Sequence, residues 1–324
     1  MTIQARARAG SNIALVKYWG KRESALNLPA TGSISLTLDS LFTVTTVKLT
    51  GNASPDRLIL NGEVTDPARV SVLLNHFRTL AQTNTGFDIS SENNFPTAAG
   101  LASSASAFAA LAVAANGVLD LQLSATRLSE LARRGSGSAA RSIFGGFVEM
   151  ARGELDDGSD SVASALADAE QWPLNVVVAI TSEAAKAVPS TQGMNHTVAT
   201  SPYFPAWLEQ VEVDLGRARQ AIAQRDFSAL CEVTEASALA MHASAMAAQP
   251  GVIYFNPATL SCIEAVRDLR EQGADVCFTI DAGPQVKAIC LPGDEDRVAD
   301  RLAAVEGVSR VLRSGLGSGA GLIE

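Results

Sequence analysis

Hydrophobic and polar positions in the first half of the chain alternate in the way that is typical of β-strands. Residues 41–49, LFTVTTVKL, and residues 145–153, GGFVEMARG, are the clearest examples. Residues 56–64, DRLILNGEV, carry Asn61 and Gly62 between two apolar runs, which is a strong hairpin signal. The first half is therefore expected to be rich in strands.

Helix signals also occur in this half. Asp66 followed by Pro67 can begin a helix that reaches about Gln82, because aspartate caps a helix and proline suits its first turn. Ser124 can cap a second helix over residues 124–135, SATRLSELARRG. The first half is thus predicted to combine strands with a few helices.

The second half changes character, because long amphipathic patterns predict helices over about 205–225, 227–248 and 257–272. Strands are expected at 175–181, 274–281, 286–291 and 308–313, with a helix at 293–307. The predicted class is α+β, with a domain boundary between residues 172 and 185. We divide the chain into domains 1–178 and 179–324.

Composition and charge limit the classes of function. The chain has 324 residues, of which 47% are hydrophobic and 18% are charged, so it can form a large folded core. Its formal charge of −9 argues against a nucleic-acid partner, because nonspecific nucleic-acid binders are usually basic. A site for a polyanion would have to be a local basic pocket.

Cysteine and histidine give no sign of a disulfide or a transition-metal site. The three histidines have no ligand spacing, and the start of the chain, MTIQARARAGSNIA, lacks the apolar core of a secretory leader. The longest apolar run, 107–115, is shorter than the roughly 20 residues that span a bilayer, so no membrane partner is expected. A cytoplasmic protein with buried thiols is predicted from Cys231, Cys262, Cys277 and Cys290, none of which forms a CxxC pair.

A turn of small residues followed by an Ala-rich helix is the first candidate for chemistry. Residues 96–106 read PTAAGLASSAS. The free N–H groups at a helix start can hold phosphate oxygens, small side chains leave room, and serine hydroxyls can help to hold a phosphate-bound Mg²⁺. The same stretch is also compatible with an ordinary helix packed on a sheet, and it lacks the Walker A pattern. Another glycine-rich stretch, 315–321, has no helix after it, which argues against a dinucleotide site.

This turn resembles the phosphate loop of the GHMP kinase superfamily. Further stretches, in this order and spacing, resemble the diphosphomevalonate decarboxylase family: SNIALVKYWGKR (11–22), NLPATGSISLTL (27–38), GSGSAARSIFGGFVEM (135–150), STQGMNHTVATSPYF (190–204) and TIDAGPQVK (279–287). The resemblance implies a two-domain GHMP kinase fold, with an N-terminal GHMP domain and a helix-rich, ferredoxin-like C-terminal domain. It also implies a homodimer.

Two residues gain a catalytic role through the resemblance. Asp281 ends an apolar strand and, by itself, could be a turn aspartate that caps its own backbone. The family makes it the carboxylate that orients a tertiary hydroxyl and accepts its proton during phosphoryl transfer. Lys17, which alone would read as a surface lysine, matches the family lysine beside this aspartate.

The remaining assignments follow the family motifs. The substrate diphosphate would contact Tyr18, Lys21, Ser136, Gly137, Ser138, Arg141, Ser190 and Thr191, with residues 190–193 in a loop. ATP would contact Asn12, Pro96, Ala98, Ala99, Gly100, Leu101, Ser103, Ser104 and Ser106, and Mg²⁺ would bind through the ATP phosphates with Ser104 or Ser106 as candidate ligands. The chain departs from the family at Thr191, where some bacterial members carry a nearby arginine, at Ala140, where cysteine is common, and at Gln285, where asparagine is common.

The implied activity is ATP-dependent decarboxylation of mevalonate 5-diphosphate to isopentenyl diphosphate, with Mg²⁺ and ATP as cofactors. Three related activities stay open: decarboxylation of the monophosphate, phosphorylation of the 3-hydroxyl of mevalonate without decarboxylation, and a general small-molecule kinase. A binding protein without catalysis is the alternative from another class. The presence of both Asp281 and Lys17 favours the full decarboxylase.

Overall fold

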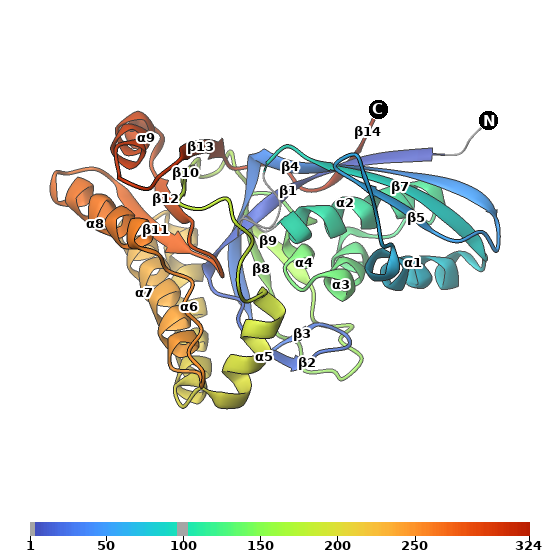
Figure 1. The fold of residues 1–324 in the computed structure, drawn as a ribbon, viewed down its shortest axis with the longest axis horizontal. Coiled ribbons are helices and arrows are strands. Elements are labelled where there is room, and N and C mark those ends of the chain that lie inside the picture. The colour runs from blue at the N-terminus through green and yellow to red at the C-terminus, as the bar shows by residue number, and fades with distance from the viewer. Residues whose placement is uncertain (1–3, 96–102) are drawn as a thin grey trace.

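The computed structural model describes residues 4–95 and 103–324. Its elements divide into two groups, one around a long twisted sheet and one around a smaller sheet with long helices (Figure 1). The first group contains β1 (Gln4–Val16), β2 (Lys21–Glu23), β3 (Leu28–Pro29), β4 (Ser33–Asn52), β5 (Arg57–Leu60), β6 (Glu63–Thr65), α1 (Ala68–Ala81), β7 (Thr85–Asn93), α2 (Ser103–Val118), α3 (Ala125–Gly135), α4 (Ala139–Ser142), β8 (Phe147–Met150) and β9 (Ala163–Ala167). The second contains β10 (Asn175–Ile180), α5 (Ser190–Thr200), α6 (Phe204–Gln224), α7 (Phe227–Met246), α8 (Pro257–Glu271), β11 (Val276–Ile280), β12 (Val286–Cys290), the short 3₁₀ helix η1 (Pro292–Asp294), α9 (Glu295–Ala303) and β13 (Arg310–Gly315), and the chain ends with β14 (Gly321–Ile323).

The larger sheet is built on β1 and β4, which pair antiparallel along most of their length. Its strand order is β14-β1-β4-β7-β5-β6, with β8 joined to β4 and β9 joined to β8. The predicted hairpin is confirmed as β5–β6, and Asn61 and Gly62 both have positive φ, as a two-residue turn requires. Helices α1 to α4 lie along one face of the long strands (Figure 1). This half is as rich in strands as the sequence predicts.

Helix α2 is the central helix of this half, and most of its residues are buried. Its run of alanines has no bulky side chains, so the backbone can lie close to β1 and β4. The predicted cap of α3 is confirmed, because the Ser124 side chain accepts a hydrogen bond from the backbone N–H of Arg127. These helices carry some of the residues that line the candidate site from this half; others come from β1 and the segment after it.

The smaller sheet is antiparallel, in the order β11-β12-β10-β13. Helices α6 to α8 match the three predicted amphipathic stretches closely, and the helix expected at 293–307 is the shorter α9, which follows η1. The expected domain boundary at 178/179 falls inside β10, which pairs with β12 and β13 over residues 175–180. The first residues of β10 therefore belong to the smaller sheet.

The end of the chain crosses back to the larger sheet. β14 pairs with β1, and the N–H of Gly317 donates to the carbonyl of Thr37. A Cβ on Gly317 would lie 2.7 Å from the carbonyl oxygen of Leu38, and one on Gly145 would lie 2.6 Å from the backbone nitrogen of Gly319. The glycine-rich stretch 315–321 thus allows close backbone packing against β4 and the segment before β8.

One predicted loop is a helix. Residues 190–193 form the first turn of α5, which follows Pro189. The helix buries Met194 and Thr197, and the Thr197 hydroxyl donates to the Gly193 carbonyl. The sequence STQGMNHT is mostly polar and shows no clear apolar periodicity, so the hydrophobic pattern did not predict this helix. Across the described ranges, no helix is long and apolar enough to cross a membrane.

Candidate active site

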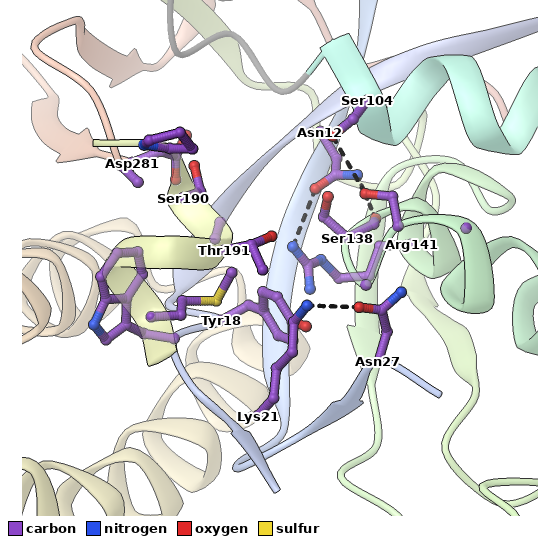
Figure 2. Close-up of a pocket in the computed structure, with 18 of the residues that line it drawn as sticks. Asn12, Tyr18, Lys21, Asn27, Ser104, Ser138, Arg141, Ser190, Thr191 and Asp281 are labelled. Atoms are coloured by element: carbon purple, nitrogen blue, oxygen red, sulfur yellow. Dashed lines mark hydrogen bonds between the residues drawn. The ribbon is translucent and has the colours of Figure 1, made fainter. Parts of the chain in front are cut away.

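A pocket of about 700 Å³ opens between the two halves of the molecule. Its walls come from α1, the end of β1, the start of α2, residues 134–141, the start of α5 and the turn after β11. Figure 2 shows Asp281, Ser190 and Thr191 on one side of this space, and Asn12, Ser104, Ser138 and Arg141 on the other. The site therefore needs both halves of the chain.

The pocket is strongly basic although the chain is acidic. Among the lining residues that the structure describes, Asp281 is the only one with a carboxylate. The cationic lining residues are Lys17, Lys21, Arg69, Arg134, Arg141 and Lys186. This excess of positive charge is suited to a ligand with several phosphate charges.

Asp281 lies at the end of β11 and is held between two lysines. Nζ of Lys17 lies 2.8 Å from Oδ1 of Asp281, and Nζ of Lys287 lies 3.2 Å from Oδ2. Both lysine side chains are 1% exposed, whereas that of Asp281 is 22% exposed. We call these three residues the lysine clamp. The structure thus brings together the two residues that the sequence assigned to catalysis and adds a third.

Burial and charge act in opposite directions in the lysine clamp. Burial by itself raises the pKa of Asp281, but the charges of Lys17 and Lys287 outweigh it and hold that pKa well below its usual range. Burial lowers the pKa of Lys17 to about 8, although the Asp281 charge opposes this shift. At neutral pH the carboxylate is therefore ionised and the Lys17 ammonium is mostly protonated.

The turn after Asp281 is fixed by side chains of the second half. The Gln285 side chain accepts from the backbone N–H of Thr181 at 2.6 Å and donates to the carbonyl of Ser182 at 2.5 Å. The hydroxyls of Thr181 and Thr259 both donate to the Pro284 carbonyl. Glutamine thus reaches the end of β10 from a position where the family often has asparagine.

The opposite wall contains a second group of polar residues, which we call the anion cradle: Tyr18, Lys21, Ser136, Gly137, Ser138 and Arg141. Arg141 is 2% exposed, and its guanidinium donates to the hydroxyls of Ser35 and Ser33 and to the side-chain oxygen of Asn12. These partners are neutral, and burial lowers the pKa of Arg141 to about 10. A buried cation with neutral partners is well placed to bind an anionic ligand.

Gly137 fits against Tyr18 because it has no side chain. A Cβ at Gly137 would lie 2.2 Å from the phenolic oxygen of Tyr18. That hydroxyl is buried, and burial raises the pKa of Tyr18 to about 12, so the group stays a neutral hydrogen-bond donor. Lys21, which also lines the pocket, donates to the side-chain oxygen of Asn27 at 2.6 Å.

The start of α5 brings two predicted substrate residues to the pocket. Ser190 and Thr191 both line it. Lys186 donates to the hydroxyl of Ser190 and to the carbonyl of Ala282, each at 2.8 Å. This lysine therefore ties the start of α5 to the turn that carries Asp281.

The predicted ATP residues are only partly described. Pro96, Ala98, Ala99, Gly100 and Leu101 lie outside the described residues. Ser103 and Ser104 line the pocket at the start of α2, and the Ser104 and Ser136 hydroxyls are 3.2 Å apart.

The structure gives two other residues that were assigned to ATP different surroundings from those expected. Ser106 is fully buried, and its hydroxyl lies 2.6 Å from that of Thr43. It is two positions beyond Ser104, so the helix turns it toward β4 and away from the pocket. Asn12 lines the pocket but is bonded to the anion cradle, because its amide donates to the carbonyl of Ser138 and the hydroxyl of Ser142.

The described residues fit a magnesium ion that arrives with phosphate rather than one in a protein cage. They contain no cluster of three or more His, Cys, Asp or Glu side chains that could hold a metal. Mg²⁺ keeps several waters and binds through phosphates with one or two protein oxygens. The exposed Ser104 hydroxyl, at a helix start on the pocket wall, can supply one such oxygen.

Sequence reasoning missed Lys186, Lys287 and Asn27. A signal for Lys287 was present, because a single lysine in an otherwise apolar strand, VKAIC, needs a buried partner. Asn27 and Lys186 lie in loop-like sequence without such a pattern. Their roles depend on contacts between segments that are far apart in the chain.

Comparison with known proteins places the chain in a family. Residues 9–163 match the model of the diphosphomevalonate decarboxylase-like N-terminal domain, and residues 176–312 match that of the mevalonate 5-diphosphate decarboxylase C-terminal domain. The chain belongs to the diphosphomevalonate decarboxylase family. Family membership also establishes the expected GHMP kinase fold.

Individual relatives match over nearly the whole chain. Diphosphomevalonate decarboxylase mvd1 of Aspergillus fumigatus is 40% identical over 326 residues, which cover 94% of this chain and 81% of the relative. The crystal structure of mevalonate diphosphate decarboxylase from Staphylococcus aureus is 38% identical, with a TM-score of 0.94, and the match covers 100% of this chain and 99% of that one. A complex of the protein MDDEF with MVAPP, AMPPCP and magnesium is 40% identical, with a TM-score of 0.92 and complete coverage of both chains.

Proposed function

We propose that this protein catalyses the ATP-dependent decarboxylation of mevalonate 5-diphosphate to isopentenyl diphosphate, CO2, ADP and phosphate. The observation that carries the proposal is the ionised Asp281, paired with Lys17 at the edge of a basic pocket in a chain of this family. The MDDEF complex, which holds MVAPP, AMPPCP and magnesium, supports ATP and Mg²⁺ as the cofactors.

Asp281 and Lys17 prepare the substrate hydroxyl. A tertiary alcohol is a weak nucleophile, and a carboxylate about 3 Å away can orient it and accept its proton as the new O–P bond forms. Bound MgATP supplies the phosphoryl group. Lys17 keeps Asp281 ionised and fixes one of its oxygens, so the other lone pairs of the carboxylate stay available to the substrate.

Decarboxylation then follows from the electronics of the phosphorylated substrate. The C3–O bond breaks as phosphate leaves with its electron pair, and positive charge develops at C3. The electron pair of the bond to the carboxylate forms the C=C bond, and CO2 departs. The anion cradle holds the diphosphate during both steps, with Arg141 and Lys21 as cations and Ser136, Gly137, Ser138 and Tyr18 as close contacts.

The other assignments remain proposals of the same kind. Ser190 and Thr191 contact the substrate from α5, and the start of α2 with residues 96–101 holds the ATP phosphates, with Ser104 near Mg²⁺. We also propose a homodimer and a cytoplasmic location; four free cysteines are compatible with a reducing compartment. The division into domains 1–178 and 179–324 is a proposal as well; the two family models match residues 9–163 and 176–312, and the second match begins inside β10.

The test is an assay of the purified protein with Mg²⁺ and ATP, in which mevalonate 5-diphosphate and mevalonate 5-phosphate are offered separately. ADP and CO2 are measured together. We expect equal amounts of both from the diphosphate only. CO2 from the monophosphate would reassign the substrate, ADP without CO2 would make the protein a kinase, and no turnover with either would favour a binding protein.

A further inference from the structure

The second lysine of the clamp contacts Asp281 without lining the pocket. Lys17 is part of the pocket wall, whereas Lys287 is not among the lining residues that the structure describes. The Lys287 ammonium nevertheless lies 3.2 Å from Oδ2 of Asp281, the oxygen that Lys17 does not contact. Each oxygen of the carboxylate therefore has its own lysine.

The position of Lys287 in the fold is unusual for a lysine. It lies in β12, whose five residues are all buried and are otherwise apolar, and it pairs with Val178 on one side and Thr279 on the other. Burial of an ammonium group is costly unless a negative charge compensates it. The carboxylate of Asp281, 3.2 Å away, supplies such a charge.

The two lysines reach Asp281 from different halves of the molecule. Lys17 follows β1 of the larger sheet, and Lys287 belongs to the smaller sheet. Thr279, the cross-strand neighbour of Lys287, donates to the carbonyl of Ala14, which also accepts from Lys17 Nζ. The clamp is thus tied to both sheets around a single carboxylate.

We propose that Lys287 is a positioning residue for the reaction, which acts through Asp281 by fixing the second carboxylate oxygen and keeping the group ionised. The inference deepens the proposed function and rests on it. Lys287 is not expected to contact either substrate, so its removal should affect the reacting step and leave binding nearly unchanged.

The other charged and titratable groups near Asp281 determine which pKa values would change if Lys287 were removed. Besides the two lysines, Asp281 is faced by Lys186 ahead of α5, by His242 on α7 and by Arg141 on α4. Burial lowers the pKa of His242 to about 3, so this residue is neutral at working pH. Lys287 lowers the pKa of Asp281 and also that of Lys17. Loss of Lys287 should therefore raise both pKa values, a pattern that simple loosening of the fold would not produce.

The experiment compares wild type with Lys287→Met, which removes the charge and keeps the shape. We expect kcat to fall about tenfold or more while both KM values stay within about twofold, because the reacting group is displaced but the pocket is intact. The alkaline limb of the pH profile, set by Lys17, should move to higher pH. Lys48→Met is the matched control, since Lys48 is exposed on β4, and it should behave as wild type.

A second readout does not depend on activity. In protein with ¹³C-labelled aspartate carboxyls, the Asp281 signal is identified by its loss in Asp281→Asn and titrated without substrate. We expect its pKa to rise by about one unit or more in Lys287→Met. Lys287→Arg keeps the charge, so it should restore both the wild-type pH profile and the wild-type Asp281 titration. Lys287→Gln replaces the methionine variant if that protein does not fold.

The outcomes separate the two proposals. An unchanged pH profile and an unchanged Asp281 titration in the methionine variant would overturn the role of Lys287. A rise in KM without a fall in kcat would overturn it too. A shifted Asp281 titration in Lys287→Met, together with a wild-type protein that releases no CO2, would support the clamp and refute the proposed activity. Equal defects in Lys287→Arg and Lys287→Met would show that the charge is irrelevant and would also overturn the inference.

Discussion

The lysine clamp and the anion cradle both bury cations beside one pocket, but they balance charge in opposite ways. In the clamp, Lys17 and Lys287 face a carboxylate of the protein itself. In the cradle, the guanidinium of Arg141 bonds only to neutral oxygens among its described partners. In the clamp the protein therefore supplies the compensating negative charge itself, whereas the cradle leaves room for an anion that the protein does not supply.

Neutral partners alone do not mark an anion site, as Arg133 demonstrates. This arginine is also fully buried, and its guanidinium donates to the carbonyls of Ser161, Leu26 and Gly158. Arg133 is absent from the described pocket wall, whereas Arg141 is part of it. Arg141 has neutral partners and also lies on the pocket wall, so it is the one of the two arginines that is placed to meet a ligand.

The largest effect is expected from the centre of the clamp. Asp281→Asn keeps the shape but removes the base and the negative charge between two buried lysines. We expect the rate constant of ADP formation in a single-turnover assay to fall about 10³-fold, within the range typical of a lost general base. Asp275→Asn, in the exposed residue before β11, is the control and should keep full activity. Full activity in Asp281→Asn would end the case for this carboxylate.

Loss of the buried cation of the anion cradle should weaken binding of the diphosphate substrate. Arg141→Met removes a charged donor from the pocket wall, and we expect kcat/KM for the diphosphate to fall about 100-fold, mostly through KM. Arg133→Met should instead leave KM unchanged and lower the free energy of unfolding by about 3 kcal/mol, because buried carbonyls lose their partners. If both variants raised KM equally, the distinction between the two arginines would fail.

The pH dependence of the wild type tests the clamp alone. Because burial lowers the pKa of Lys17 to about 8, its ammonium is lost as pH rises past that value. Activity should then decline above pH 8 by up to about tenfold per unit. Between pH values of about 8 and 10.5 the unfolded chain holds the Lys17 proton more tightly than the folded chain does. The contribution of Lys17 to the free energy of unfolding therefore rises with pH in that window. A parallel loss of melting temperature and activity would therefore point to unfolding instead.

Local patterns predicted the fold well, but only part of the site. The hairpin at Asn61-Gly62 and the cap at Ser124 follow from neighbouring residues, so sequence sufficed. The Lys17–Asp281 pair joins residues 264 positions apart, and only the family motifs suggested it. Lys287 and the burial of Ser106 depend on which way a side chain turns within packed elements. No run of neighbouring residues encodes such contacts.

A glycine substitution tests how closely the cradle is packed. Gly137→Ala would place a methyl group 2.2 Å from the phenolic oxygen of Tyr18, so the ring or the backbone must move. We expect KM for the diphosphate to rise about tenfold, with little change in the KM for ATP. Gly216→Ala in α6, where an added Cβ meets nothing within 4 Å, is the matched control and should stabilise the protein by up to about 1 kcal/mol.

The smallest effect distinguishes two serines two positions apart on one helix. Ser104 lines the pocket, so Ser104→Ala should raise the KM for ATP about three- to fivefold, the value of one neutral hydrogen bond. Ser106 faces Thr43 inside the core, so Ser106→Ala should leave that KM unchanged and lower the free energy of unfolding by about 1 kcal/mol. Steady-state kinetics and urea unfolding of both variants measure the two effects together. The reverse result would mean that α2 presents Ser106 to the nucleotide, and the assignment of Ser104 to Mg²⁺ would have to be withdrawn.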